Sequence, residues 1–224
     1  MVLPRREPAL SLTEYLRQNW IEVVNDTIAH FDLTVVVMVI AVLIGVGVGV
    51  LTYQTPIFSN FSITTAAAFL TIPSFALLGI LIPFLGLGYK PVLLALVLYA
   101  LLPIIRNTVV GLSGVDNAMI EAARGLGMGK VQLLLRVRLP VAWPVILTGI
   151  RVSTQIVVGI AAIGAYVNGP GLGNEIFSGL ARFGAVNSLN QVLIGTVLIV
   201  ILAIIFDLAY QVVGRFTTSK GIRA

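Results

Sequence analysis

The stretch EAARGLGMGKVQLLLRVRLP (residues 121–140) carries charges and glycines in a chain that is otherwise almost continuously apolar. Two interpretations compete: a glycine-rich phosphate loop around GLGMGK, and a pair of short helices. A phosphate loop of the pattern G-x-x-x-x-G-K-[ST] needs a glycine at position 124 and a hydroxyl at position 131. The chain has Arg124 and Val131 there, and no strand pattern precedes them, so the pair of helices is favoured.

Two short helices also fit the residues before this stretch. Asp116 is suited to cap a first helix over NAMIEAARGL (117–126), with Gly127 near its end. KVQLLLRVR (130–138) predicts a second helix that stops before Pro140. Residues spaced four apart on the first helix predict a small apolar surface, formed by Ala118, Ala122 and Leu126 and, beside them, by Met119 and Ala123.

The composition predicts an all-α integral membrane protein. Of the 224 residues, 58% are hydrophobic and 10% are charged, whereas soluble domains carry about a quarter charged residues. With no cysteine and a single histidine, His30, the sequence offers no thiolate site or histidine cluster for a metal, and no cofactor is expected. A membrane-embedded enzyme would need clustered ionisable side chains in the bilayer, so a non-catalytic protein is expected.

The apolar runs predict about five transmembrane helices. From Leu33 to Tyr89 the chain has no Asp, Glu, Lys, Arg or His, which is too long a run for one crossing of about 20 residues. A turn at YQTPIFSNFS (53–62) is expected to divide this run, and Arg106 with Asn107 to end the third span. The predicted spans are 33–53, 62–85, 91–107, 141–167 and 190–213.

The chain is predicted to have three parts: an N-terminal amphipathic segment (1–32), a transmembrane domain (33–213) with a coupling loop at 106–140, and a tail (214–224). Residues 1–32 have apolar positions at helical spacing interrupted by charges, which fits an interfacial helix or, equally, a helix packed on the bundle. Lys and Arg gather in the 106–140 loop and in the tail, so both are predicted to be cytoplasmic and the N-terminus external. Topology therefore accounts for the net charge of +5 without nucleic acid as a partner.

The opening stretch resembles the EAA loop of permease subunits from bacterial ABC importers. The family pattern is EAA, three residues, G, nine residues, I, one residue, LP; the chain has Glu121-Ala122-Ala123, Gly127, Val137 in place of Ile, and Leu139-Pro140. The resemblance implies a type I ABC importer permease fold in the bacterial inner membrane, with a loop that docks into a cleft of a separate ATP-hydrolysing subunit, two of which serve the transporter. The residues to which it assigns this coupling are Asp116, Glu121, Ala122, Ala123, Leu126, Gly127, Met128, Leu139 and Pro140.

Three further segments narrow the resemblance. TIPSFALLGI (71–80), YALLPIIRNT (99–108) and IGAYVNGPGLG (163–173) are similar to permeases that import glycine betaine, carnitine and choline. This implies quaternary ammonium osmoprotectants as substrates, and as partners a second permease copy or homologous permease and an extracytoplasmic substrate-binding protein. Methionine-type importers share the architecture, so a permease for methionine or another amino acid stays open, as does a less favoured passive channel.

Candidate residues for the translocation path are prolines expected to bend spans two and three and aromatic side chains whose faces can hold a quaternary ammonium. They are Pro73, Ser74, Phe75, Tyr99, Pro103 and Tyr166, with further rings at Phe69 and Phe177. Ordinary kinking and packing are the alternative. Arg151 and Asp207 are expected to pair or to reach the interface rather than to contact substrate. Gly45 and Gly49 predict a close approach between two helices.

Overall fold

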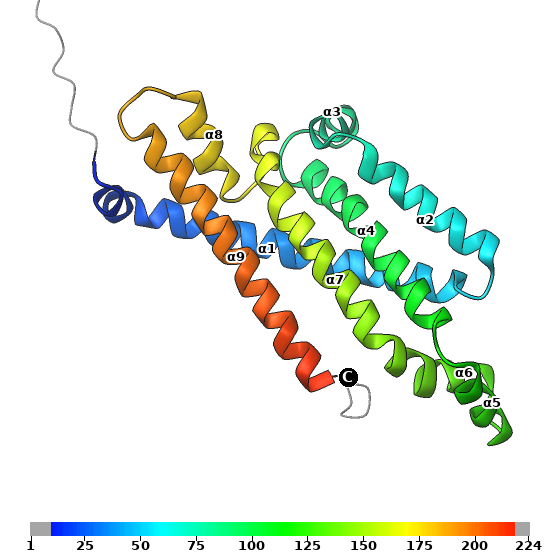
Figure 1. Cartoon of the computed structure of the whole chain (residues 1–224). Coiled ribbons are helices and arrows are strands. Elements are labelled where there is room, and N and C mark those ends of the chain that lie inside the picture. The colour runs from blue at the N-terminus through cyan, green and yellow to red at the C-terminus, as the bar shows by residue number, and fades with distance from the viewer. Residues whose placement is uncertain (1–9, 218–224) are drawn as a thin grey trace, which may run out of the picture. The chain divides into compact units, whose positions relative to one another are not determined.

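A computed structural model of the whole chain describes residues 10–217, which fold into helices without any strand (Figure 1). This confirms the predicted all-α class. The helices are α1 (Leu12–Thr52), α2 (Pro56–Thr71), α3 (Ser74–Leu85), α4 (Tyr89–Ser113), α5 (Asn117–Gly125), α6 (Lys130–Leu133), α7 (Leu139–Ala161), α8 (Gly173–Ala181) and α9 (Ser188–Thr217); a π-helical segment (Leu134–Arg138) joins α6 to α7, and a 3-10 segment (Ala162–Val167) follows α7.

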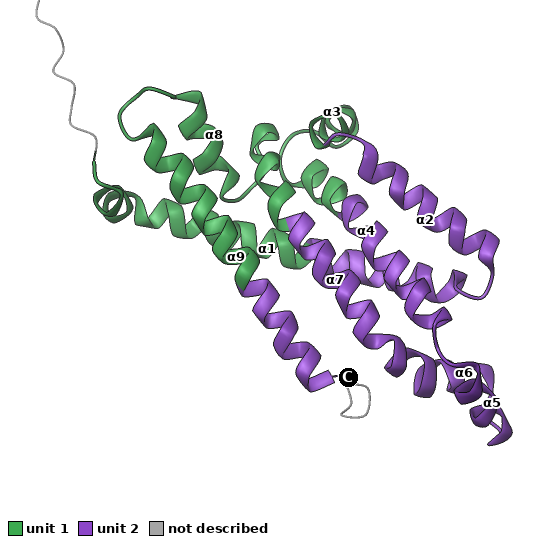
Figure 2. Ribbon diagram, in the orientation of Figure 1, with its two compact units in different colours: residues 1–36, 74–96, 158–204 green, residues 37–73, 97–157, 205–224 purple. Residues whose placement is uncertain are grey.

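The chain divides into two compact units (Figure 2). Among the described residues, unit 1 comprises 10–36, 74–96 and 158–204, and unit 2 comprises 37–73, 97–157 and 205–217. The long helices α1, α4, α7 and α9 contribute residues to both units. Each unit is therefore built from segments that lie far apart in the sequence.

Four helical segments are long and apolar enough to cross a membrane: α1, α4, the run Lys130–Val167, and α9. The pair α2 and α3 adds a fifth candidate if it is counted as one broken span. The number agrees with the prediction, but the boundaries differ. Helix α1 runs through residues 32 and 33 without interruption, because main-chain hydrogen bonds carry a helix past isolated charges such as Asp32. An interfacial place for residues 12–32 stays a prediction.

The predicted second span, 62–85, begins earlier and is broken. Pro56 starts α2, because a proline at the first helical position gives up only an N–H that has no intrahelical partner. Pro73 ends the helix, since the residue before a proline is driven out of the α region; Ile72 is extended, with φ −72° and ψ 127°. The hydroxyl of Tyr99, in α4, donates a hydrogen bond of 2.8 Å to the Ile72 carbonyl and so satisfies the broken end.

Arg106 and Asn107 do not end the helix, since α4 continues to Ser113; the end of the third membrane span at these residues stays a prediction. Polar side chains do not end α4, because they bond back to the helix. The Asn107 amide donates to the Pro103 carbonyl at 2.8 Å, and the Thr108 hydroxyl donates to the Ile104 carbonyl at 2.7 Å. A helix that satisfies its own polar side chains can extend beyond its apolar run.

The close helix approach predicted at Gly45 and Gly49 is confirmed within unit 2. A Cβ at Gly45 would lie 2.7 Å from the side chain of Ile104, and one at Gly49 would lie 2.6 Å from Thr108. Only glycine leaves room for α4 at these two positions of α1. The contact holds the backbones of two candidate spans together without a polar bond.

Candidate functional site

The segment predicted to couple to the ATPase folds as a helical hairpin, residues 115–133, within unit 2; we call it the coupling hairpin. Its first helix, α5, is capped as predicted: the Asp116 carboxylate accepts a hydrogen bond of 2.9 Å from the backbone N–H of Ala118. This bond satisfies one of the N–H groups left free at the start of a helix. The cap therefore fixes where α5 leaves the end of α4.

Gly127 ends α5 in the left-handed conformation, with φ +81°. Two hydrogen bonds close the turn: the Gly127 N–H donates to the Arg124 carbonyl at 2.9 Å, and the Met128 N–H donates to the Ala123 carbonyl at 3.1 Å. This pair of bonds is the Schellman arrangement, for which glycine is the usual residue at the left-handed position. The prediction that Gly127 lies near the end of the helix is confirmed.

The hairpin has a small apolar core of its own. Val115, Ile120, Ala123 and Leu133 are buried together, and Met128, Val137 and Val141 pack against them. Ala123, which the sequence assigns to the apolar docking surface, lies in this core instead, because it faces the second helix. Exposed on α5 and its end are the other members of the predicted surface and the charged Glu121, namely Ala118, Met119, Glu121, Ala122 and Leu126.

The second helix does not stop before Pro140. After α6 the backbone passes through the π-helical segment directly into α7, and the Leu139 N–H donates to the Leu134 carbonyl, five residues back. A proline has no N–H to donate, and the wider π turn precedes the position where an α-helical bond would be missing. Leu139 is half-buried and Pro140 exposed in the first turn of α7.

Three aromatic side chains that lie far apart in the sequence meet in unit 1. The rings of Phe75, at the start of α3, and Tyr166, in the 3-10 segment, stand perpendicular at 89° with centroids 5.2 Å apart. Phe177, in α8, lies 6.5 Å from Phe75 and 6.3 Å from Tyr166. Tyr166 is 68% exposed and Phe75 48% exposed. We call these three residues the aromatic cluster; its open ring faces can attract a cation.

The other candidate path residues lie elsewhere. Tyr99 is buried in unit 2, and its hydroxyl is occupied by the Ile72 carbonyl, so its ring is not open to a solute. Pro103 lies inside α4, half-buried, while its carbonyl accepts the Asn107 amide. Pro73 lies in the break between α2 and α3 and is exposed, and Ser74 is the first residue of α3. Among the six candidates, Phe75 and Tyr166 bring their rings into contact.

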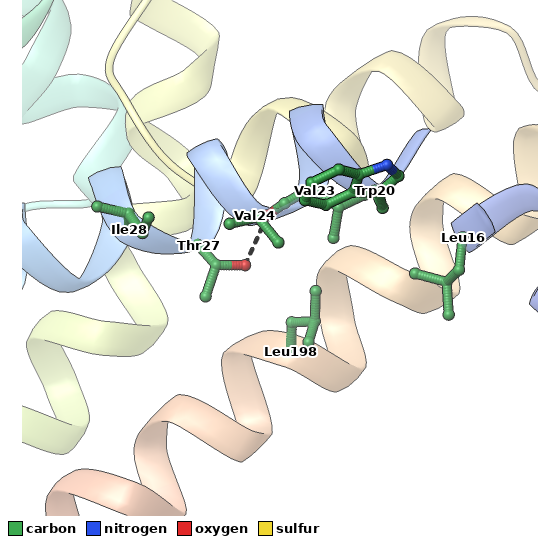
Figure 3. A pocket seen from close by; sticks show the side chains of 7 residues that line it. All are labelled: Leu16, Trp20, Val23, Val24, Thr27, Ile28 and Leu198. Carbon is green, nitrogen blue, oxygen red and sulfur yellow. Dashed lines mark hydrogen bonds between the residues drawn. The ribbon is translucent and has the colours of Figure 1, made fainter. Parts of the chain in front are cut away.

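Two pockets differ in chemistry. One in unit 1, of about 360 Å³, lies between α1 and α9 and is apolar; its lining is Leu16, Trp20, Val23, Val24, Thr27, Ile28 and Leu198 (Figure 3). The Thr27 hydroxyl there is already used, donating to the Val23 carbonyl at 2.7 Å. The other, in unit 2, is of about 310 Å³ and is lined by Tyr53, Gln54, Ser113, Arg124, Lys130, Leu133 and Arg138. A polar or ionic ligand suits only the second.

Sequence reasoning missed a buried carboxylate in unit 1. Glu175, in α8, is 3% exposed, and the Tyr15 hydroxyl donates to it at 3.3 Å across 160 residues of sequence. Burial, and then the nearby negative charge of Glu22, raise the pKa of the Glu175 carboxyl above its ordinary value. A single glutamate in a glycine-rich segment shows no spacing from which its contact with Tyr15 could be predicted.

The expected pairing of Arg151 with Asp207 is confirmed in unit 2. The Arg151 guanidinium in α7 donates two hydrogen bonds to the carboxylate of Asp207 in α9, the second of 2.6 Å from Nη2. Gln211 donates to the same carboxylate at 3.0 Å. Each charge therefore has its partner within the protein, which agrees with a structural role.

Comparison with known proteins identifies the family. Residues 31–219 match the binding-protein-dependent transport system inner membrane component family. The carnitine transport permease protein OpuCB of Listeria monocytogenes is 34% identical over 213 residues, covering 95% of this chain and 96% of that protein. The choline transport system permease protein OpuBB of Bacillus subtilis (strain 168) is 34% identical over 212 residues, with the same coverage.

A comparison with solved structures supports the same family. An inward-facing structure of the MetNI methionine ABC transporter contains a chain that superposes with a TM-score of 0.76 and 26% identity, covering 91% of this chain and 99% of that one. The match therefore covers nearly the full length of both chains. The helical hairpin, the apolar spans and these matches together show that the chain belongs to the binding-protein-dependent transport system inner membrane component family and is a permease subunit.

Proposed function

We propose that this permease imports quaternary ammonium osmoprotectants such as glycine betaine, choline and carnitine, driven by ATP. The observation that carries the proposal is the identity of 34% over 95% of the chain to permeases named for carnitine and choline transport. The aromatic cluster supports it, because ring faces attract a diffuse positive charge without a fixed carboxylate.

The partners follow from the same family. Two cytoplasmic ATPase subunits, a second copy of the permease or a homologous permease, and an extracytoplasmic substrate-binding protein complete the transporter. The exposed face of α5, with Ala118, Ala122 and Leu126, docks into an ATPase subunit, with Gly127 and Met128 shaping the turn beside it. ATP hydrolysis takes place in those subunits, and this chain contributes no catalytic group.

Transport is an exchange between inward-open and outward-open states. Movement of the hairpin, when two ATPase subunits close on ATP, passes to α7 through the continuous helical backbone from Lys130. The chain lies in the bacterial inner membrane with the hairpin and the C-terminus in the cytoplasm and the N-terminus outside, as the clustering of Lys and Arg favours.

Uptake by the reconstituted transporter tests the proposal. Vesicles containing this permease, its ATPase and its binding protein, with ATP on the ATPase side, are given labelled choline, carnitine, glycine betaine or methionine. ATP-dependent uptake of a quaternary ammonium is expected. Equal uptake without ATP contradicts the importer and favours a channel.

Methionine is a second candidate substrate, favoured by the superposition on the methionine transporter with a TM-score of 0.76. The same uptake experiment separates the two candidates. Uptake of methionine alone overturns the osmoprotectant proposal, and leaves the ATP-driven importer in place.

A further inference from the structure

The pocket of about 310 Å³ in unit 2 gathers positive charge. Three of its seven lining residues, Arg124, Lys130 and Arg138, are cationic, and none of the seven is acidic. The remaining polar groups are supplied by Tyr53, Gln54 and Ser113. We call this hollow the basic pocket. Because like charges repel, three cations around one hollow are stabilised when an anion enters it.

Arg138 and Gln54 of the basic pocket are held in place by neutral partners. Arg138 donates from Nη1 to the Leu112 carbonyl at 2.8 Å, and its guanidinium lies 5.2 Å from the ring centroid of Tyr53. The Tyr53 hydroxyl accepts a hydrogen bond of 2.7 Å from the Gln54 amide. Within residues 10–217 no carboxylate lies within salt-bridge distance of the three cations. The three cations therefore stay unneutralised, and one of them, Arg138, is fixed in position.

The position of the basic pocket indicates the source of its anion. Tyr53 comes directly after the last residue of α1, Ser113 is the last residue of α4, and Arg138 directly precedes α7. Three candidate membrane spans thus end or begin at the pocket. Side chains flanking Tyr53 and Gln54 are apolar and strongly exposed: Leu51 at 84%, Ile57 at 77% and Phe58 at 62%. A cationic hollow beside an apolar surface matches the two ends of a phospholipid.

We propose that the basic pocket binds the phosphate of an anionic phospholipid headgroup, which thereby bridges the coupling hairpin and the ends of α1, α4 and α7. Arg124 and Lys130 reach the phosphate from the hairpin, and Arg138 with Tyr53 and Ser113 from the helix ends. The acyl chains lie along the exposed apolar side chains around Tyr53. The proposal is independent of the solute that the permease carries.

The basic pocket is distinct from the surface proposed to meet the ATPase. Ala118, Ala122 and Leu126 on α5 are exposed and do not line the pocket, whereas Arg124 on the same helix does. The two functions therefore use different faces of one hairpin. A lipid can occupy one face while a protein covers the other.

Lipid retention by the purified transporter tests the proposal. The complex is equilibrated with phosphatidylcholine nanodiscs containing phosphatidylglycerol, and the phosphatidylglycerol that stays bound after extraction is counted by native mass spectrometry. Arg124→Gln and Lys130→Gln are each expected to weaken binding about fivefold, from the attraction of one basic residue to an anionic lipid. Arg136→Gln removes an exposed charge from the same segment outside the pocket and is the matched control. Neither pocket variant removes a hydrogen bond that holds the fold, so both are expected to assemble.

The competing sources of negative charge give different results. Inorganic phosphate at millimolar concentration is expected not to lower the number of phosphatidylglycerol molecules that stay bound. If phosphate displaces the bound phosphatidylglycerol, the site binds free phosphate. If the two variants weaken ATPase binding equally with and without phosphatidylglycerol, the occupant is a carboxylate of the ATPase. Either result overturns the proposal, and so does equal lipid loss in Arg136→Gln.

Discussion

The coupling hairpin of unit 2 and the aromatic cluster of unit 1 are held together in opposite ways. In the hairpin, the cap at Asp116, the turn at Gly127 and the buried Ile120 all bond or pack within a few turns of chain. In unit 1, Phe75 meets Tyr166 from another helix, and Glu175 meets Tyr15 across 160 residues. Changes in the hairpin should therefore act locally on coupling, whereas changes in unit 1 should affect the fold and the site together.

The largest effect is expected at the hairpin turn. Gly127→Trp should abolish uptake, since any other residue at φ +81° costs about 1–2 kcal/mol and a bulky one also obstructs docking. Membrane insertion and folding should persist, because the change lies outside the spans. Uptake and co-purification of the ATPase are measured together. Gly125→Ala, in the ordinary helix two residues earlier, is the control; uptake by Gly127→Trp equal to wild type would show that the hairpin does not couple.

The next largest effect is expected at the ion pair of Arg151 and Asp207, which joins two distant parts of the sequence within unit 2. Asp207→Asn leaves Arg151 without its carboxylate partner and should lower the midpoint of thermal unfolding by a few degrees, because an unpaired charge among membrane helices is unfavourable. Gln211→Leu removes only the neutral hydrogen bond to Asp207 and should change it less. Thermal unfolding of the purified permease compares them. Equal midpoints for wild type and Asp207→Asn would mean that the pair adds no stability.

At the aromatic cluster, Tyr166→Ala should raise the choline concentration for half-maximal uptake about two- to fivefold, the value of one exposed cation–ring contact. Tyr166→Phe keeps the ring and should behave as wild type. Uptake by reconstituted vesicles is measured over a range of choline concentrations. A loss shared by Tyr166→Phe would assign the effect to the hydroxyl and remove the ring from the proposal.

The smallest effect is expected at Glu175, and it depends on pH. Its pKa is raised in the folded protein, so above that pKa folding must bury a carboxylate, while the unfolded group titrates near 4.5. Stability should fall as pH rises from 4.5 through the raised pKa. Glu175→Gln should remove this loss, so its advantage grows with pH. Thermal unfolding from pH 4.5 upward measures it, with Glu22→Gln as a weaker control; an advantage independent of pH would contradict the prediction.

The same contrast explains what the sequence could predict. The cap, the glycine turn and the EAA pattern occupy fixed spacings along one segment, so Asp116 and Gly127 could be assigned from the sequence. Ala123 was placed on the wrong face, because helical spacing alone does not tell which side meets α6. The helix bounds differ from the predicted apolar runs where a local effect overrides hydropathy: Pro56 begins a helix, Pro73 breaks one, and Asn107 bonds back into one. The meeting of Phe75, Tyr166 and Phe177 depends on the whole of unit 1.

The π-helical segment before Pro140 joins α6 to α7 without an intervening loop. Because no loop separates Lys130 from α7, we expect a rotation of the hairpin to be passed on to α7. A coil of similar length would absorb such a twist by rotating its own dihedrals. The π-helical segment is also the place where this helix is expected to bend most easily, because a π turn is less favourable than an α-helical turn. A partner that moves the hairpin would therefore move α7 with it, and any bending between the two is expected at Leu134–Arg138.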